Sequence, residues 1–211
     1  MDKNAQRYIA VIGDLVDSKR ITDRYRFQES FARDLSRVGQ SDLASPYTLT
    51  LGDEFQALYG SARGLFYDLF AIRAGIYPVR CRFSVAIGEI TTPINSKQAI
   101  GMDGPAFHEA RAEIERLKKS DDELHLSGFE DSIRELLVPA IRLLWASTEL
   151  WQVNRLRILM RELESVCPRK DEYRLEITER AIHKNIRDAR LHDWVELIEQ
   201  AETRIEQCLH P

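Results

Sequence analysis

Apolar runs and amphipathic stretches alternate along the first 130 residues of the chain. The run YIAVIG at residues 8–13 is short, almost entirely apolar and rich in β-branched side chains, which is typical of a strand buried on both faces. Between such runs, apolar residues recur every three or four positions, as on the buried face of a helix. The pattern predicts strands at residues 8–13, 45–60 (a hairpin), 79–92 and 122–129, and helices at residues 21–39, 62–78 and 104–119.

This order of elements predicts an α+β fold, a ferredoxin-like sandwich with an antiparallel sheet and helices on one face. In that topology the first and third strands are antiparallel neighbours, so Asp14, which ends the first strand, approaches Asp53 at the hairpin tip. Two close carboxylates repel unless a proton or a cation lies between them. We therefore expect Mg²⁺ or Mn²⁺ there, together with phosphates. The alternative is turn chemistry, with Asp14 as a cap and Asp53 as a turn residue.

The second part of the chain has helical spacing throughout, which predicts two domains, residues 1–127 and residues 128–211. Residues 170–194 resemble a helix-turn-helix, with a turn near Glu176 and a second helix capped by Thr178. The basic residues expected on the exposed side of that second helix are the candidate DNA contacts, Arg180, His183, Lys184 and Arg187. A helical bundle with a solvated basic face is the alternative.

Composition narrows the classes of partner and compartment. The formal net charge of -4 gives no general attraction to nucleic acid or to a membrane surface. Cys81, Cys167 and Cys208 are far apart and odd in number, which indicates reduced thiols in a reducing compartment. No segment has the apolar length of a signal peptide core or of a membrane span. We expect a cytoplasmic protein with no membrane partner.

Four motifs resemble those of class III nucleotide cyclases, in the order that this family has. VIGDLVDSKR, which contains Asp14, resembles the first metal motif of the cyclases. TLGDEFQALY, which contains Asp53, resembles their second metal motif and the GGDEF motif of diguanylate cyclases. RCRFSVAIGEITT and GPAFHEARAEIE resemble the strand and the helix that follow.

The resemblance implies a role for each matching residue. Asp14 and Asp53 would bind the metal, and Arg111 would be the transition-state arginine. The residues that would lie near the bound nucleotide are Ser18, Gly52 and Glu54. Cyclases complete each site with two chains, so the resemblance also implies a homodimer in which Arg111 faces the partner's aspartates.

Two departures from the cyclase pattern bear on activity. Phe107 stands where cyclases have the asparagine that orients the ribose, and Asp17 replaces a glycine near the phosphates. Both departures favour binding over turnover, whereas the retained Arg111 favours turnover.

The segments GDLVDSKR, TLGDEFQ and GMDGPAFHEAR are also similar to those of the SatD family, so the chain is identified as a member. The expected function is a cytoplasmic regulatory protein that binds a nucleotide at a magnesium-dependent, cyclase-like site and couples this to DNA binding. Two alternatives stay open. One is an active enzyme of the nucleotidyl cyclase type, and the other is a DNA-binding protein whose cyclase-like part is only a dimerisation scaffold.

Overall fold

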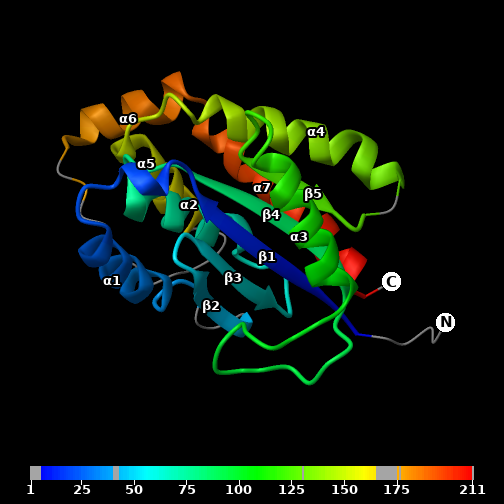
Figure 1. The fold of residues 1–211 in the computed structure, drawn as a ribbon. Helices are drawn as coiled ribbons and strands as arrows, with labels where there is room; N and C mark the ends of the chain where they lie inside the picture. Colours follow the sequence, from blue (N-terminus) through cyan, green and yellow to red (C-terminus); the bar gives the residue numbers. More distant parts are fainter. Residues whose placement is uncertain (1–5, 40–42, 130, 165–174, 176, 211) are drawn as a thin grey trace.

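A five-stranded sheet in the order β2-β3-β1-β4-β5 lies at the centre of the computed structural model (Figure 1). The structure describes residues 6–39, 43–129, 131–164, 175 and 177–210. Strands β2, β3, β1 and β4 are antiparallel neighbours, whereas β5 runs parallel to β4. The strands are β1 (Arg7–Leu15), β2 (Leu43–Leu51), β3 (Glu54–Tyr59), β4 (Cys81–Glu89) and β5 (Leu124–Ser127).

Helices connect and cover the strands, so the predicted α+β class is confirmed. Each strand and helix predicted before residue 130 is present within a few residues of its expected position. The helices are α1 (Arg24–Leu35), α2 (Leu65–Ile76), α3 (Pro105–Leu117), α4 (Asp131–Ser147), α5 (Val153–Leu163), α6 (Glu179–Asp188) and α7 (Leu191–Leu209), and a single 3₁₀ turn spans Ser18–Arg20. None of the helices in the described part of the chain is long and apolar enough to cross a bilayer.

Helices cover both faces of the sheet, so the expectation of helices on one face is wrong. Side-chain alternation in β1 explains this arrangement. Ile9 and Val11 belong to the core beneath α1 and α2, whereas Ala10 and Ile12 pack with α3 on the opposite face. Asp14 continues the second series and therefore points to the α3 side. The predicted antiparallel pairing of β1 with β3 is confirmed, and it places Asp14 opposite Glu54.

The C-terminal helices pack into the same core as the sheet. Trp145 of α4 stacks on Phe70 of α2 at 4.9 Å between ring centroids and meets the edge of Phe83 of β4 at 5.7 Å. Trp194 of α7 contacts Phe70 from another side, at 6.3 Å. The boundary expected after residue 127 falls between β5 and α4, and one continuous hydrophobic cluster spans it. Residue 127 as a domain limit stays a prediction.

Helix α6 corresponds to the second helix of the expected helix-turn-helix. The Thr178 hydroxyl accepts a hydrogen bond from the backbone N–H of Ala181 at 3.3 Å, so the predicted cap is confirmed. Ile182 faces the core. The first helix and Glu176 lie outside the described residues. The four candidate DNA contacts, Arg180, His183, Lys184 and Arg187, are all exposed. Cys81 and Cys208 are buried and form no disulfide in the described part of the chain, and Cys167 is not among the described residues.

Candidate functional site

A cluster of charged side chains lies where β1 ends, on the face of the sheet that α3 covers. Asp14 of β1 and Glu54 of β3 are register partners and are only 7% and 4% exposed. Arg82 of β4 is the register partner of Asp14 on the other side, and its guanidinium donates to Asp14 Oδ2 at 3.1 Å. Two buried carboxylates side by side need compensating positive charge, because burial penalises an unpaired ion.

Helix α3 supplies that charge from above the sheet. Lys118 Nζ lies 3.6 Å from Asp14 Oδ1 and 3.5 Å from Glu54 Oε2, so one ammonium bridges both carboxylates. Arg111, seven residues earlier and hence on the same helix face, forms an ion pair with the Glu54 carboxylate and donates to Gln56 Oε1 at 3.2 Å. The four side chains of Asp14, Glu54, Arg111 and Lys118 therefore form one connected ionic network.

Asp53 lies beside this network in the β2–β3 turn. Its Oδ2 accepts a hydrogen bond from the Ser18 hydroxyl at 2.6 Å and is 3.9 Å from the guanidinium of Arg24. The turn depends on Gly52, whose φ of +63° lies in the left-handed region that favours glycine. The side-chain amide of Gln28 donates to the Gly52 carbonyl, so α1 holds the turn against the end of β1.

The protonation behaviour of the cluster reflects competition between burial and charge. Burial raises the pKa of Asp14 above its usual range, although Lys118 and Arg82 oppose the shift, and nearby Asp53 adds to it. Burial alone would lower the pKa of Lys118, but its hydrogen bond to Glu115 and the charges of Asp14 and Glu54 outweigh burial and raise that pKa. Lys118 is therefore fixed in its charged form.

The formal charges of the cluster balance. Three carboxylates, Asp14, Asp53 and Glu54, face four cations, Arg24, Arg82, Arg111 and Lys118, and Glu115, 2.9 Å from Lys118, supplies the fourth negative charge. The side chain of Arg111 is 44% exposed and that of Arg24 is 43% exposed, so both also reach solvent. An anion with several oxygens, such as a phosphate chain, matches this set of donors.

The same residues fit a divalent cation only in combination with such an anion. Among the described residues, no group of three or more His, Cys, Asp or Glu side chains is arranged to hold a metal ion by itself. Mg²⁺ commonly uses one or two carboxylates and takes its other ligands from water and substrate phosphates. Asp14 and Asp53 could supply that carboxylate pair, but Lys118 and Arg82 already neutralise Asp14. A phosphate-bound ion fits this site better than a free one.

The residues predicted from the sequence occupy different positions in the cluster. Asp14, Glu54 and Arg111 belong to the ionic network, and Ser18 and Gly52 hold the turn around Asp53. Arg111 pairs with Glu54 of its own chain.

The two departures from the cyclase pattern do not contact the ionic network. Phe107 is 7% exposed and packs in the hydrophobic core between α3 and the sheet. The Asp17 carboxylate is 64% exposed and accepts a hydrogen bond from Arg20 at 3.1 Å, so its charge is paired at the surface.

Arg24, Arg82 and Lys118 are the three members of the cluster that sequence reasoning missed. Lys118 follows Arg111 by seven residues, a spacing that places both on one face of a helix. Arg82 is a charged residue near the start of a largely apolar strand, CRFSVAIGE. Both signals were present, but they point to Asp14 only when the pairing of β4 with β1 and the side covered by α3 are known.

A second feature near the cluster is an apolar pocket of about 240 Å³ between α1 and the turn that follows α2. Phe27 and Phe31 of α1 stack at 5.8 Å between ring centroids and form one wall. Ser30 and Asp34 of the same helix add polar groups. Its remaining lining residues are Gly75, Ile76, Tyr77, Pro78 and Val79. Since Arg24 and Gln28 contact the turn at Asp53 and Gly52, α1 borders both the pocket and the cluster.

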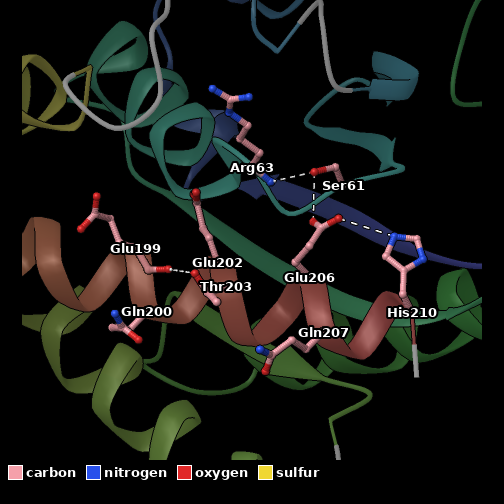
Figure 2. A pocket seen from close by; sticks show the side chains of 9 residues that line it. All are labelled: Ser61, Arg63, Glu199, Gln200, Glu202, Thr203, Glu206, Gln207 and His210. Carbon is pink, nitrogen blue, oxygen red and sulfur yellow. Dashed lines mark hydrogen bonds and ion pairs between the residues drawn. The ribbon is translucent and has the colours of Figure 1, made fainter.

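A larger pocket, of about 780 Å³, lies elsewhere, between α7 and the start of α2 (Figure 2). Two of its three carboxylates, Glu202 and Glu206, are already used within the fold. Glu202 accepts from the backbone N–H groups of Gly64 and Phe66 at 3.0 and 3.1 Å, and Glu206 accepts from Ser61 Oγ at 3.0 Å. These contacts satisfy the first N–H groups of α2, which is a structural role. We therefore place the candidate site at the charged cluster.

The comparisons with known proteins agree with one of the resemblances described above. The family model described as the SatD family matches residues 8–159, which include β1–β5 and every residue of the charged cluster. No curated protein matches the chain.

Proposed function

This chain belongs to the SatD family, and we propose that it binds a phosphate-bearing nucleotide together with Mg²⁺ or Mn²⁺ at the charged cluster. The observation that carries the proposal is the ionic network in which Arg82, Arg111 and Lys118 converge on the paired carboxylates of Asp14 and Glu54. A cluster with several cations, two of which also reach solvent, suits an anionic ligand that brings its own divalent ion.

The strand order supports the interpretation of the first part of the chain as a cyclase-like sandwich. The order β2-β3-β1-β4 with antiparallel pairing is the arrangement that a ferredoxin-like sandwich requires. Under this proposal, Asp14 and Asp53 would hold the metal ion, which neutralises phosphate charge when bound. Ser18, Arg111 and Lys118 would donate to the phosphate oxygens. Lys118 would first have to leave the carboxylates that it bridges.

The apolar pocket beside α1 is the proposed position of the nucleobase. A volume of about 240 Å³ and a wall of two stacked phenylalanines suit a flat aromatic ring. The carboxylate of Asp34 and the hydroxyl of Ser30 are the polar groups that could select the base by accepting hydrogen bonds from it.

Binding without turnover is the form of the proposal that the departures favour. Phe107 is a core residue, so the position that orients the ribose in cyclases has no polar group here. Asp17 does not oppose phosphate binding, because its carboxylate points to solvent and pairs with Arg20. An active cyclase-type enzyme is the second candidate, since Arg111 is retained and lies in the cluster.

The proposal also includes a cytoplasmic location and, as the regulatory output, DNA binding through α6. The helix buries Ile182 and exposes Arg180, Lys184 and Arg187, so its basic side is open to a phosphate backbone. A DNA-binding protein that uses the sheet only as a dimerisation scaffold is the alternative, and ligand binding at the cluster separates the two.

The test is the thermal stability of the full chain with nucleoside triphosphates, inorganic triphosphate and Mg²⁺, each alone and in combination. A ligand at about 100 times its Kd stabilises the folded state by about 2.7 kcal/mol, which a melting curve resolves. Arg111→Gln should reduce the shift, and Arg116→Gln, on the same helix but 74% exposed and paired with Glu113, should not.

Three results decide between the candidates. If no nucleotide or triphosphate changes the melting temperature, the charged cluster is not a nucleotide site. A shift with inorganic triphosphate equal to that with nucleotides would remove the proposed base pocket. Conversion of the bound nucleotide, followed by chromatography over hours, would establish the enzyme instead of the binding protein.

A further inference from the structure

The outer face of α4 carries a continuous apolar row that the core does not use. Three leucines of this row are among the most exposed apolar side chains described, with Leu136 at 78%, Leu143 at 75% and Leu150, just after the helix, at 92%. Pro139 and Ala146 between them are also exposed. We call this row the α4 stripe, and its members are Leu136, Pro139, Leu143, Ala146 and Leu150.

The opposite side of α4 already accounts for its attachment to the fold. Val138, Ile141 and Trp145 are 6%, 3% and 2% exposed and belong to the main core. The helix therefore has two apolar faces, one packed and one open. Scattered exposed leucines are ordinary, but an aligned row of this kind marks an interaction surface.

The spacing of the α4 stripe is the spacing that a second helix requires. Its four members within the helix follow one another at intervals of three, four and three residues, which is the repeat of two helices packed side by side, and Leu150 lies in the turn after Ser147. Figure 1 shows α4 at the periphery of the molecule, where a second helix could approach. We propose that the α4 stripe binds the α4 stripe of a second copy of this chain, with the two helices antiparallel.

The charges beside the stripe identify a second copy as the occupant. Glu135 and Arg142 follow one edge of the helix seven residues apart and have opposite charges, whereas Glu149 lies in the turn after the helix. Arg142 forms an ion pair with Asp122 at 2.5 Å and is 42% exposed.

An antiparallel copy can bring Arg142 opposite Glu135 of the partner subunit, and the twofold axis repeats the pair. The same register places Leu136 near Pro139 and Leu143 of the partner subunit, so the two leucines within the helix are covered. A membrane surface would instead favour a row of lysine and arginine at this edge, and here Glu135 is acidic.

The size of the stripe sets the strength of the contact. The two leucines within the helix, with Pro139 and Ala146, amount to about 400 Å² of apolar surface per copy. Stable complexes bury about 800 Å² per partner, so the contact should be weak and reversible. We expect the dimer fraction to rise across the range of about 10 to 500 μM.

Sedimentation velocity of the full chain over that concentration range tests the inference. Wild type should shift from monomer to dimer, and Leu143→Glu should weaken the dimer by about tenfold or more, because each dimer buries this leucine twice. Ile100→Glu is the matched control, since Ile100 is also an exposed apolar residue, at 42%, but lies outside the stripe. Melting curves of both variants establish that they fold.

A charge exchange tests the orientation of the helices. Arg142→Glu should weaken the dimer, and the addition of Glu135→Arg should restore it, because the intermolecular pair is rebuilt with opposite polarity. A wild-type chain that stays monomeric at all concentrations would overturn the proposal. So would a dimer that Leu143→Glu leaves unchanged. A dimer that the double exchange fails to restore would overturn the antiparallel pairing.

Discussion

Replacement of Lys118 by methionine separates the structural role of its ammonium from its role toward a ligand. Lys118 Nζ lies 3.6 Å from Asp14 Oδ1, 3.5 Å from Glu54 Oε2 and 2.9 Å from Glu115 Oε1. Methionine keeps the apolar stem of the side chain and removes its charge. The two buried carboxylates then retain only Arg82 and Arg111 as partners.

The size of the effect follows from these distances. At 3.5 Å and an effective dielectric constant of about 20, one such contact is worth at most about 5 kcal/mol. The Lys118 side chain is 31% exposed, so screening and desolvation reduce its net contribution to about 1–2 kcal/mol. For a chain of this size, that loss lowers the melting temperature of the ligand-free protein by roughly 2–8 °C.

The response to added cations distinguishes this explanation from simple loss of packing. With Lys118 removed, a divalent cation can take its place between Asp14 and Glu54, so Mg²⁺ alone should stabilise Lys118→Met more than wild type. A nucleotide without metal should stabilise the variant less, because one donor to the phosphates is gone. The two shifts should therefore have opposite signs relative to wild type.

Melting curves in chelator, in Mg²⁺ and in nucleotide measure all three quantities. Lys119→Met is the matched control, since Lys119 is the exposed neighbour on the same helix turn. An equal response of wild type and Lys118→Met to Mg²⁺ would refute the idea that the ammonium occupies the position of a cation. An unchanged melting temperature in chelator would refute the calculated contribution.

Three further predictions test other parts of the molecule. Burial holds the pKa of Asp14 above its unfolded value, so wild type loses stability as the pH rises through the folded pKa, whereas Asp14→Asn does not titrate. The melting temperature of Asp14→Asn relative to wild type should therefore increase between about pH 4 and about pH 7, and a constant difference would contradict the assignment. Arg187→Glu should weaken binding to duplex DNA in fluorescence anisotropy and make the salt slope shallower by about one, while Arg204→Glu on α7 should change neither. A fragment that ends at residue 127 should lack cooperative unfolding in calorimetry, because Phe70 would lose the rings that cover it, and a sharp transition would instead establish an independent first domain.

Local patterns in the sequence predicted the strands, most helices and one half of the site. The apolar run at residues 8–13 and the hairpin around Gly52 identify neighbouring strands, and their antiparallel pairing brings Asp14 to Glu54. Thr178 could be predicted as the start of α6 because an N-cap hydrogen bond involves only residues that are close in sequence, here the Thr178 hydroxyl and the Ala181 N–H.

Features that depend on distant segments were not predictable in the same way. The pairing of Arg82 with Asp14 depends on β4 lying beside β1, and the bridge made by Lys118 depends on α3 covering the face opposite to α1 and α2. The helical spacing of α4 has an apolar residue on nearly every side, so it does not show which face meets the core. Burial resolves this ambiguity, because Trp145 is 2% exposed and Leu143 is 75% exposed.

The contact between the two ends of the chain has a consequence for its synthesis. The guanidinium of Arg7, at the start of β1, donates to the Cys208 carbonyl at 2.8 Å and to the Gly128 carbonyl at 3.0 Å. The first strand is therefore synthesised about 200 residues before Cys208, whose carbonyl accepts the hydrogen bond from Arg7. At roughly 5–20 residues per second, the nascent strand must wait about 10–40 s for α7. Throughout that interval the apolar surface that α7 covers in the folded protein is accessible to chaperones and proteases. Ribosome stalling within α7 would therefore leave this part of the core exposed.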